Sequence, residues 1–464
     1  MSDNAFPRMT AHARPDSLEC SVAHFMASES IARVLATTCL AGPLEVDEIV
    51  DRWNRALGKR WRWLRPLARR VVAEFAEDHR PRAAVVSQFI NSDAGFQRAA
   101  RQHELRVAEH LLVTAPVMSP ARAAAAWQLP SLRTPGELAH WLDLDVRQLE
   151  WLADLRSLES KRPPGPQRHY HYRPLAKRFG QVRMIESPKP RLKQLQHRIL
   201  TGILEQLPPH PAAHGFCRGR SIQSFAQPHV GKQVVLRIDL QDFFPTLRRA
   251  WVQALFRTVG YPEAVAALLA GLCTNVAPAD AWNTVDRKRF QRSESTIRLY
   301  ARPHLPQGAP TSPALANLCA YRLDCRLAGL AQAASANYSR YADDLAFSGQ
   351  SDFERVAQRF AIHVCTTAME EGFTVQHRKT RRMKRGVRQH LAGLVVNERL
   401  NVRRSEFDRL KAILTNCIRC GPQSQNRDNY TDFRAHLQGR LSFIEQVNAD
   451  KGRRLRALFH QIQW

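Results

Sequence analysis

Two adjacent acidic residues, Asp343 and Asp344, lie between two apolar segments typical of strands, at residues 336–341 and 345–348. Carboxylate pairs of this kind hold hard divalent cations. Cations held in this way bring a nucleophilic hydroxyl onto a nucleoside triphosphate. The alternative is a solvated hairpin turn, since Asp is a favoured turn residue. Residues 341–344 (Tyr-Ala-Asp-Asp) therefore indicate a metal site if further carboxylates join them.

Asp239 supplies a third carboxylate. It ends the run 234–239 (Val-Val-Leu-Arg-Ile-Asp), whose β-branched residues predict a buried strand. An unpaired charge at the end of such a strand costs several kcal/mol, and a cation shared with Asp343 and Asp344 would offset that cost. Two Mg²⁺ ions need roughly three carboxylates plus the substrate phosphates. The alternative for Asp239 is a helix N-cap, where Asp is also favoured.

The order of the motifs resembles the reverse transcriptase family. Residues 239–244 (Asp-Leu-Gln-Asp-Phe-Phe) resemble its first palm motif, and residues 341–344 resemble its second metal-binding motif. The other similar blocks are 183–196 for the fingers, 214–222 leading into the palm, 305–313 beside the incoming nucleotide, 371–380 for the fourth palm motif and 389–397 for the primer grip. An ordered series over roughly residues 165–400 is far more specific than one four-residue match.

Within this family the sequence is most similar to bacterial retron enzymes of myxobacterial style. The similarity is carried by residues 213–216, 308–313, 338–345 and 393–397. The chain departs in two places. Residues 391–393 are Leu-Ala-Gly where Val-Thr-Gly is usual, and Asn275 begins an Asn-Val-Ala-Pro stretch that lacks the His of an Asn-Ala-x-x-His signature. These departures concern the retron assignment and leave the polymerase motifs intact.

The resemblance implies an α+β fold, a right-hand polymerase of fingers, palm and thumb with an antiparallel palm sheet. The expected parts are a helical N-terminal region at 1–160, fingers and palm at 161–400, and a helical thumb at 401–464. The residue pattern itself predicts helices at 249–259, 263–273 and 313–330.

The resemblance also assigns the catalytic residues. Asp239, Asp343 and Asp344 would hold two Mg²⁺ ions, and Lys379 would protonate the pyrophosphate leaving group. The alternative for Lys379 is one more member of the basic run 378–388. Members of this run are expected to contact the template–primer backbone, where each neutralised phosphate makes binding salt-dependent. They are Arg378, Arg381, Arg382, Lys384 and Arg385.

Four residues are candidates for binding the incoming nucleotide. Phe244 falls where the family places a steric gate, a ring that excludes a ribose 2′-OH; the alternative is that Phe243 and Phe244 both belong to the core. Gln307 and Gly308 would line the nucleotide and template, since glycine permits close backbone approach. Arg183 would clamp the triphosphate. Lys177 and Lys189 are further candidates for the same contact.

Composition limits the partners. The chain has 464 residues, 44% of them hydrophobic, and a formal net charge of +27. This charge predicts a polyanionic partner, and duplex or structured RNA fits best. A basic membrane-surface protein would need an apolar anchor, and none is evident, so we expect no membrane partner. The nine cysteines have no regular spacing, which favours free thiols, and no signal peptide is visible, so we expect a cytoplasmic protein.

The N-terminal region carries a basic segment with interleaved aromatics at residues 51–70, including Trp53, Trp61 and Trp63. Such a segment can bind a nucleic-acid backbone, or it can be an amphipathic helix whose tryptophans face a core. We favour the core for the tryptophans and nucleic acid for the arginines.

Three functions are consistent with the residues. The leading hypothesis is an RNA-directed DNA polymerase of a retron, which would copy a structured non-coding RNA with dNTPs into branched RNA–DNA and act in antiphage defence with an accessory effector protein. The second is another bacterial reverse transcriptase, from a diversity-generating, CRISPR-associated or group II intron-derived group, with an ordinary 3′–5′ junction. The third is a catalytically idle RNA-binding scaffold, against which the three carboxylates argue.

Overall fold

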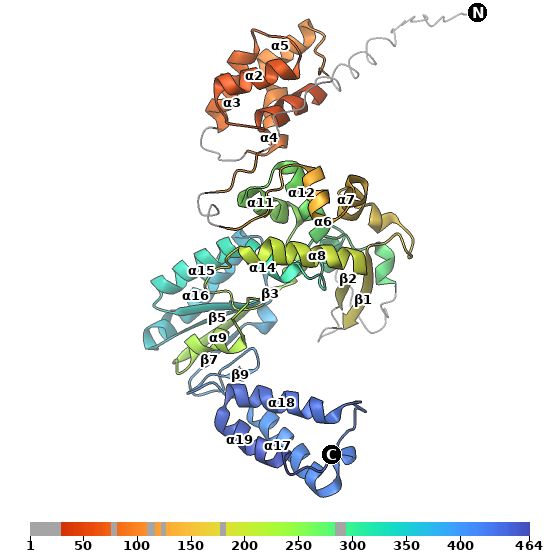
Figure 1. The fold of residues 1–464 in the computed structure, drawn as a ribbon. Helices are drawn as coiled ribbons and strands as arrows, with labels where there is room; N and C mark the ends of the chain where they lie inside the picture. The colour runs from red at the N-terminus through yellow and green to blue at the C-terminus, as the bar shows by residue number, and fades with distance from the viewer. Residues whose placement is uncertain (1–28, 76–80, 109–116, 122–126, 177–181, 284–293) are drawn as a thin grey trace, which may run out of the picture. The chain divides into compact units, whose positions relative to one another are not determined.

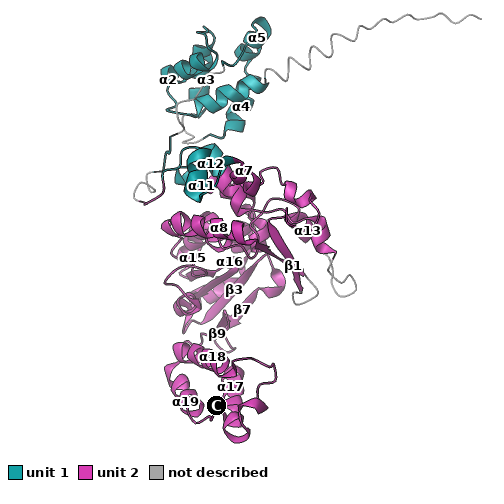
Figure 2. Ribbon diagram, turned by 45° about the vertical axis from the view of Figure 1, so that its right-hand side comes forward, with its two compact units in different colours: residues 1–125, 131–146, 256–267 teal, residues 126–130, 147–255, 268–464 magenta. Residues whose placement is uncertain are grey.

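The computed structural model describes residues 29–75, 81–108, 117–121, 127–176, 182–283 and 294–464. The chain forms two compact units (Figures 1 and 2). Unit 1 comprises residues 1–125, 131–146 and 256–267, and unit 2 comprises residues 126–130, 147–255 and 268–464. Three helices contribute residues to both units: α7 (Val146–Ala153), α11 (Arg249–Val259) and α12 (Glu263–Cys273). Within the described ranges, no helix is both long and apolar enough to cross a bilayer.

Unit 1 is helical where it is described. Its own helices are α2 (Val46–Ala56), α3 (Leu64–Phe75), α4 (Ala83–Ser92), α5 (Ala94–Gln102) and α6 (Pro135–Leu142). Apolar residues at helical spacing meet in one core, in which Trp53 and Phe96 are fully buried. Trp61 and Trp63 are partly buried against the same core. The prediction that these tryptophans pack in a hydrophobic core is confirmed.

Unit 2 contains the antiparallel sheets. Its strands are β1 (Tyr170–Ala176), β2 (Val182–Pro188), β3 (Val234–Gln241), β4 (Asn337–Tyr341), β5 (Asp344–Gly349), β6 (Thr374–Val375), β7 (Arg381–Lys384), β8 (His390–Leu391) and β9 (Leu394–Val395). Strands β1 and β2 form a hairpin, as do β8 and β9. A five-stranded sheet has the order β4-β5-β3-β6, with β7 also pairing with β3. The strands predicted on either side of Asp343 are confirmed, as is the strand that carries Asp239, although β3 continues past Asp239 to Gln241.

The two faces of the five-stranded sheet differ because side chains alternate along a strand. One face carries Leu236 and Phe347 toward α16 (Ser351–Glu370), where Phe360 meets Phe347 edge-to-face at 5.1 Å. In Figure 1, α15 (Tyr321–Ala333) and α16 lie together beside this sheet. The other face carries Arg237 and Asp239, which are therefore left on the side away from these helices.

The remaining helices of unit 2 complete its core. They are α8 (Pro190–Gly202), α9 (Ile222–Ala226), α10 (Phe243–Thr246), α13 (Glu294–Tyr300), α14 (Ser312–Cys319), α17 (Arg404–Cys420), α18 (Phe433–Val447) and α19 (Ala449–Phe459). Short 3₁₀ segments include η2 (Leu158–Lys161) and η7 (His377–Lys379). Leu410, Leu437 and Leu455 of the last three helices share a core cluster with Val235 and Ala346 of the sheet.

The prediction of a single helix at 313–330 is wrong in one respect, because this segment forms two helices, α14 and α15. Ala320 lies between them with φ −84° and ψ 3°, outside the helical range. The apolar spacing continues across the break, from Leu315 to Leu323 and Leu327, all buried. The spacing of apolar residues therefore does not indicate where the first helix ends and the second begins. The helices predicted at 249–259 and 263–273 are confirmed as α11 and α12.

Candidate active site

Strand pairing brings the three candidate carboxylates together. Strands β3 and β5 are antiparallel, and their register sets Asp239 directly opposite Asp344. The backbone N–H of Leu240 donates to the carbonyl of Asp343 at 2.8 Å, so the turn between β4 and β5 is fastened to the end of β3. Directly opposed residues project from the same face of a sheet. Asp239 and Asp344 thus share a face, with Asp343 beside them in the turn.

A buried ion pair fixes this turn from the opposite face. Arg340, the residue before Tyr341 in β4, is fully buried and donates to both carboxylate oxygens of Asp324 in α15 at 2.6 and 2.7 Å. The same guanidinium donates to the side-chain oxygen of Asn317 at 3.0 Å and to the carbonyl of Ala342 at 3.1 Å. Ala342 has a φ of 55°, a left-handed conformation that needs support. Arg340 supplies that support through the Ala342 carbonyl.

Residues 213–217 pack against the turn that carries Asp343. A Cβ on Gly215 would lie 2.7 Å from the backbone nitrogen of Ala342, so only glycine fits at this approach. Asn317 donates to the carbonyl of Gly215 at 2.7 Å, and the N–H of His214 donates to the carbonyl of Arg340 at 2.7 Å. The turn that carries Asp343 is therefore held by the protein on two sides.

Two basic side chains form ion pairs with the carboxylates. Lys379 in η7 donates to both oxygens of Asp239, each at 3.0 Å. Arg237 donates to Asp344 three times, at 2.7 to 2.9 Å. Burial and then the negative charge of Asp343 raise the pKa of Asp239 to about 6, although Lys379 opposes the rise. Burial also raises the pKa of Asp344, while Arg237 opposes that rise. Negative charge thus remains in excess around Asp239 and Asp343.

Phe243 and Phe244 differ in their surroundings. Phe243 is buried and stacks on Phe373 at 5.6 Å. Phe244 is only partly buried, and its ring meets Phe243 at 5.7 Å and Phe216 at 6.3 Å, both edge-to-face. The alternative in which both rings belong to the core therefore holds for Phe243 and not for Phe244.

The loop of Gln307 and Gly308 lies against β2. The N–H of Glu186 donates to the carbonyl of Gln307 at 2.9 Å, and a Cβ on Gly308 would lie 2.9 Å from the carbonyl oxygen of Glu186. Arg183 is exposed on the same strand, three residues from Glu186. Lys189 instead donates to the carbonyls of Gly165 and Pro166, at 2.7 and 3.3 Å. Lys177 lies outside the described residues.

A buried polar network lies behind this loop. The Glu186 carboxylate, fully buried, accepts from the side chains of Asn275 and His304, each at 2.8 Å. Burial opposes a charge on His304, but Glu186 beside it raises the pKa of the imidazole above its ordinary value. Asn275 and His304 also exchange two backbone hydrogen bonds at 3.0 Å. The sequence shows no His four residues after Asn275, but folding brings one from 29 residues downstream.

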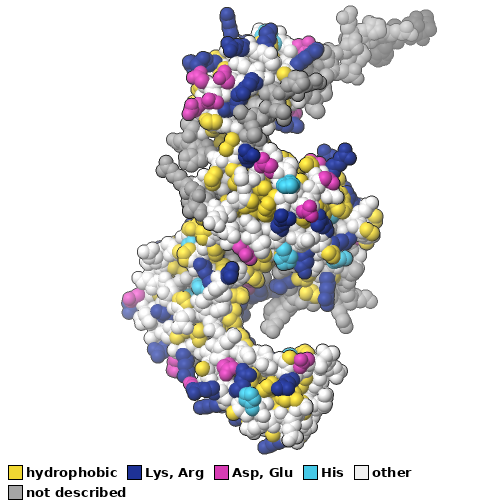
Figure 3. Space-filling model, in the orientation of Figure 1, with side chains coloured by type: hydrophobic (Ala, Val, Ile, Leu, Met, Phe, Trp, Pro, Cys, Tyr) yellow, Lys and Arg dark blue, Asp and Glu magenta, His cyan; other side chains and the backbone are white. Residues whose placement is uncertain are grey.

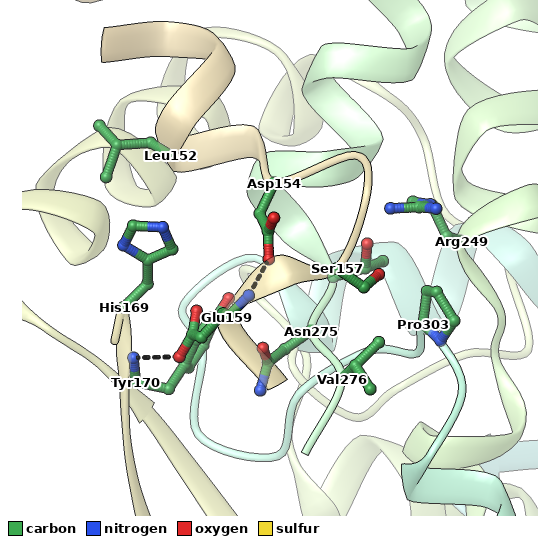
Figure 4. Close-up of a pocket in the computed structure, with 11 residues that line it drawn as sticks. Leu152, Asp154, Ser157, Glu159, His169, Tyr170, Arg249, Asn275, Val276 and Pro303 are labelled. Carbon is green, nitrogen blue, oxygen red and sulfur yellow. Dashed lines mark hydrogen bonds between the residues drawn. The ribbon is translucent and has the colours of Figure 1, made fainter. Parts of the chain in front are cut away.

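The network continues to a small pocket formed by η2, the start of β1 and the segment after α12 (Figure 4). Asn275 donates to the hydroxyl of Tyr172 at 3.0 Å, and that hydroxyl donates to Glu159 at 3.0 Å. Figure 4 shows Glu159 accepting from the N–H of Tyr170, also at 3.0 Å. Burial raises the pKa of Glu159 to about 7. The β1–β2 hairpin is thus joined by hydrogen bonds to the loop of Gln307.

The candidate nucleic-acid-binding residues form an exposed basic segment around β7. Strand β7 pairs with β3, and Met383 alone of its residues is buried. Arg378, Arg381, Arg382, Lys384 and Arg385 are all exposed. Lys384 is paired with Glu354 at 2.9 Å. Figure 3 shows Lys and Arg side chains spread over the visible face, with Asp and Glu in smaller groups.

Comparison with known proteins identifies this arrangement. Residues 175–399 match the family model described as reverse transcriptase (RNA-dependent DNA polymerase). The retron Mx65 reverse transcriptase of Myxococcus xanthus is 40% identical over 71% of this chain and 72% of its own length. The retron Mx162 enzyme of the same organism is 35% identical over 73% of this chain and 69% of its own. The chain belongs to the retron reverse transcriptases. The retron Ec86 enzyme of Escherichia coli is 32% identical over 59% of this chain and 74% of its own.

This retron reverse transcriptase is therefore an RNA-directed DNA polymerase, and reverse transcriptases generally use divalent metal ions. Among the described residues, no three His, Cys, Asp or Glu side chains form a ready-made metal cluster. In this structure the carboxylate of Asp344 is turned to Arg237 and that of Asp239 to Lys379. The donor set nevertheless fits a hard cation, because the groups around Asp239 and Asp343 are carboxylate oxygens whose repulsion a cation relieves.

Several residues that build the site carried no sequence signal. The partners of Arg340, Asp324 and Glu186 are distant in the chain, so no local pattern shows that these charges are buried and paired. Arg237 could have been found, because it lies two residues before Asp239 and so projects from the same face of the strand. Its reach to Asp344 is the diagonal contact of an antiparallel pair.

Proposed function

We propose that nucleotide transfer takes place at Asp239, Asp343 and Asp344. Two Mg²⁺ ions held there would activate the primer hydroxyl and stabilise the leaving pyrophosphate oxygens. The observation that carries this proposal is the register of β3 and β5, which opposes Asp239 to Asp344 beside the Asp343 turn. Asp239 and Asp343 form the principal pair, because Asp344 is held by the less exposed Arg237, at 24%, whereas the Lys379 that pairs with Asp239 is 53% exposed and can move away.

Lys379 acts beside this pair as the proton donor to the leaving pyrophosphate. Its ammonium lies 3.0 Å from Asp239 and its side chain is 53% exposed, so it can turn from the carboxylate to a phosphate oxygen without unfolding any element. The alternative, a purely structural partner of Asp239, is supported by the same contact. A Lys379→Arg variant separates the two, because Arg keeps the ion pair and loses the ability to release a proton.

The incoming dNTP is bound by Arg183, Gln307, Gly308 and Phe244. Partial exposure of the Phe244 ring beside the carboxylates supports its role as a gate against the ribose 2′-OH. The close approach of Gly308 to the backbone of β2 supports a loop that keeps a fixed distance from Arg183. Arg183 contributes the bidentate phosphate contact.

Residues 161–400 correspond to fingers and palm, residues 401–464 to the thumb, and residues 1–160 to a helical N-terminal region. Arg378, Arg381, Arg382, Lys384 and Arg385 contact the template–primer backbone. Their exposure and the net charge of +27 support this role.

The product is a branched RNA–DNA hybrid copied from a structured non-coding RNA, and the system serves antiphage defence with an accessory effector. The similarity to three retron enzymes over more than half of the chain supports this product. The second candidate product, DNA with an ordinary 3′–5′ junction, is retained because residues 391–393 and the stretch after Asn275 depart from the retron pattern.

Extraction of the nucleic acid bound to protein expressed with its native operon tests this function. The sample is treated with RNase, then with debranching enzyme, beside an Asp343→Asn variant and an exposed control, Asp352→Asn, whose side chain is 91% exposed. We expect a short DNA in the wild type and the control, with a mobility that shifts on debranching. DNA insensitive to debranching would support the second candidate product, and RNA alone in every sample would support a scaffold.

A further inference from the structure

Phe216 combines two unfavourable features beside the carboxylates. Its side chain is 54% exposed, and its φ of 60° lies in the left-handed region. A bulky residue rarely adopts this conformation, because its Cβ approaches the following carbonyl oxygen. Together with the partly exposed rings of Phe244 and Tyr341, this ring forms an apolar patch of the kind that marks ligand-binding grooves. Backbone strain of this kind is common at functional sites, which suggests that the position of the Phe216 ring has a function.

Buried hydrogen bonds and close backbone packing hold the loop that carries Phe216. The preceding Gly215 packs on the backbone of Ala342, and its carbonyl accepts from the buried Asn317. Asn317 in turn accepts from Arg340, which also donates to the carbonyl of Ala342. The loop of Phe216 and the turn of Asp343 therefore share one buried support, which holds the backbone before Phe216 against this turn.

The neighbours of Phe216 form an aromatic rim. Its ring centroid lies 6.3 Å from that of Phe244 and 6.2 Å from that of Tyr341, within the usual range for aromatic pairs. Tyr341 also meets Phe225 at 5.7 Å and packs against the core cluster of the three C-terminal helices. The rim thus extends from the proposed sugar gate toward α17–α19, while Arg183 and Gln307 belong to the β2 side.

We propose that Phe216 stacks on the terminal base pair of the template–primer and positions its end against Asp239 and Asp343. This inference rests on the polymerase function proposed above. A base offers an aromatic face whatever its identity, so the contact is independent of sequence. The occupant is template–primer, because the rim runs from Phe244 through Phe216 and Tyr341 to Phe225, which shares a core cluster with α17–α19, the proposed thumb.

Three variants test the proposal: Phe216→Ala, Phe216→Tyr and Phe216→Gly. Base stacking on an aromatic side chain predicts that Phe216→Ala weakens template–primer binding by about 10- to 100-fold, while Phe216→Tyr binds as the wild type does. The KM for dNTP should change by less than about threefold. Ile362→Ala is the control, since Ile362 is an apolar residue 62% exposed on α16, away from the carboxylates.

Phe216→Gly separates function from folding. Glycine adopts a positive φ without strain, so this variant should melt at or above the wild-type temperature while binding template–primer as poorly as Phe216→Ala. A lower melting temperature for Phe216→Gly, or wild-type binding by Phe216→Ala, would overturn the proposal. So would a rise in the KM for dNTP with unchanged template–primer affinity. Failure of the polymerase function is distinguished by the wild type, which would then extend no primer at all.

Discussion

The buried ion pair between Arg340 and Asp324 should be the most sensitive structural element of the site. Both side chains are 0% exposed, and the pair holds the turn that carries Asp343. Asp324→Asn leaves the Arg340 charge buried without a counter-charge. Breaking a buried pair in this way costs about 3–5 kcal/mol. For a unit of about 300 residues, whose unfolding entropy is about 2.1 cal/mol/K per residue, that corresponds to a fall in Tm of about 5–8 °C.

The comparison is an exposed ion pair measured in the same assay. Arg298 and Glu294 lie 2.9 Å apart with side chains 69% and 80% exposed. Surface pairs of this kind contribute about 0–1 kcal/mol. Glu294→Gln should therefore lower the Tm by no more than about 2 °C. Thermal unfolding by circular dichroism, together with RNA-templated primer extension at 20 °C, measures both effects.

A double variant separates stability from positioning. Arg340→Met with Asp324→Leu replaces the pair by apolar groups of similar volume, which often restores stability. We expect only part of the lost Tm to return and primer extension to remain low, because the carbonyl of Ala342 and the amide oxygen of Asn317 still lack their donor and the hydroxyl of Tyr338 lacks its acceptor. Wild-type extension by the double variant would refute the positioning role. A Tm for Asp324→Asn equal to that of Glu294→Gln would refute the buried-charge reasoning.

Three further predictions concern other parts of unit 2. Glu159 has an ordinary pKa near 4.5 and one of about 7 in the folded protein, so the stability it contributes is complete below pH 4.5 and is lost as the pH rises through 7. Between pH 5 and 8 the free energy of unfolding of Glu159→Gln should therefore fall less than that of the wild type, by at most roughly 3 kcal/mol; parallel profiles against pH would contradict this. Phe244→Ala should raise rNTP incorporation relative to dNTP by about tenfold or more in competition assays, and unchanged selectivity would exclude the gate. Replacing Arg381 and Arg382 together by Gln should lower the slope of log Kd for template–primer against log salt by about 1 to 2, whereas an unchanged slope would place the nucleic acid elsewhere.

The local parts of the site could be predicted from the sequence. The strand ending in Asp239 and the turn of Asp343 are short-range patterns, since β-branched runs and alternation reflect burial directly. The ends of α11 and α12 also follow from local spacing. The register of β3 against β5 is of a different kind, because it depends on pairing between segments about a hundred residues apart.

The buried residues that hold the site in place could not be predicted from the sequence. Arg340 appears in the sequence as one basic residue of a strand, and nothing near it indicates that Asp324 and Asn317 will enclose it. His304 likewise lies 29 residues after Asn275, so a search for a nearby histidine misses it. Buried polar residues find partners through tertiary packing, which leaves no periodic trace in the chain.

Single-turnover primer extension on an RNA template tests the central claim most directly. The assay compares the wild type with Asp239→Asn, Asp343→Asn and the exposed control Asp352→Asn, at saturating template–primer and dNTP with Mg²⁺. Loss of a metal carboxylate removes several kcal/mol of transition-state stabilisation, so we expect the first two variants to be slower by on the order of 10³-fold or more. The control should match the wild type. Extension by Asp239→Asn and Asp343→Asn at the wild-type rate would contradict the assignment of this carboxylate pair as the reaction centre.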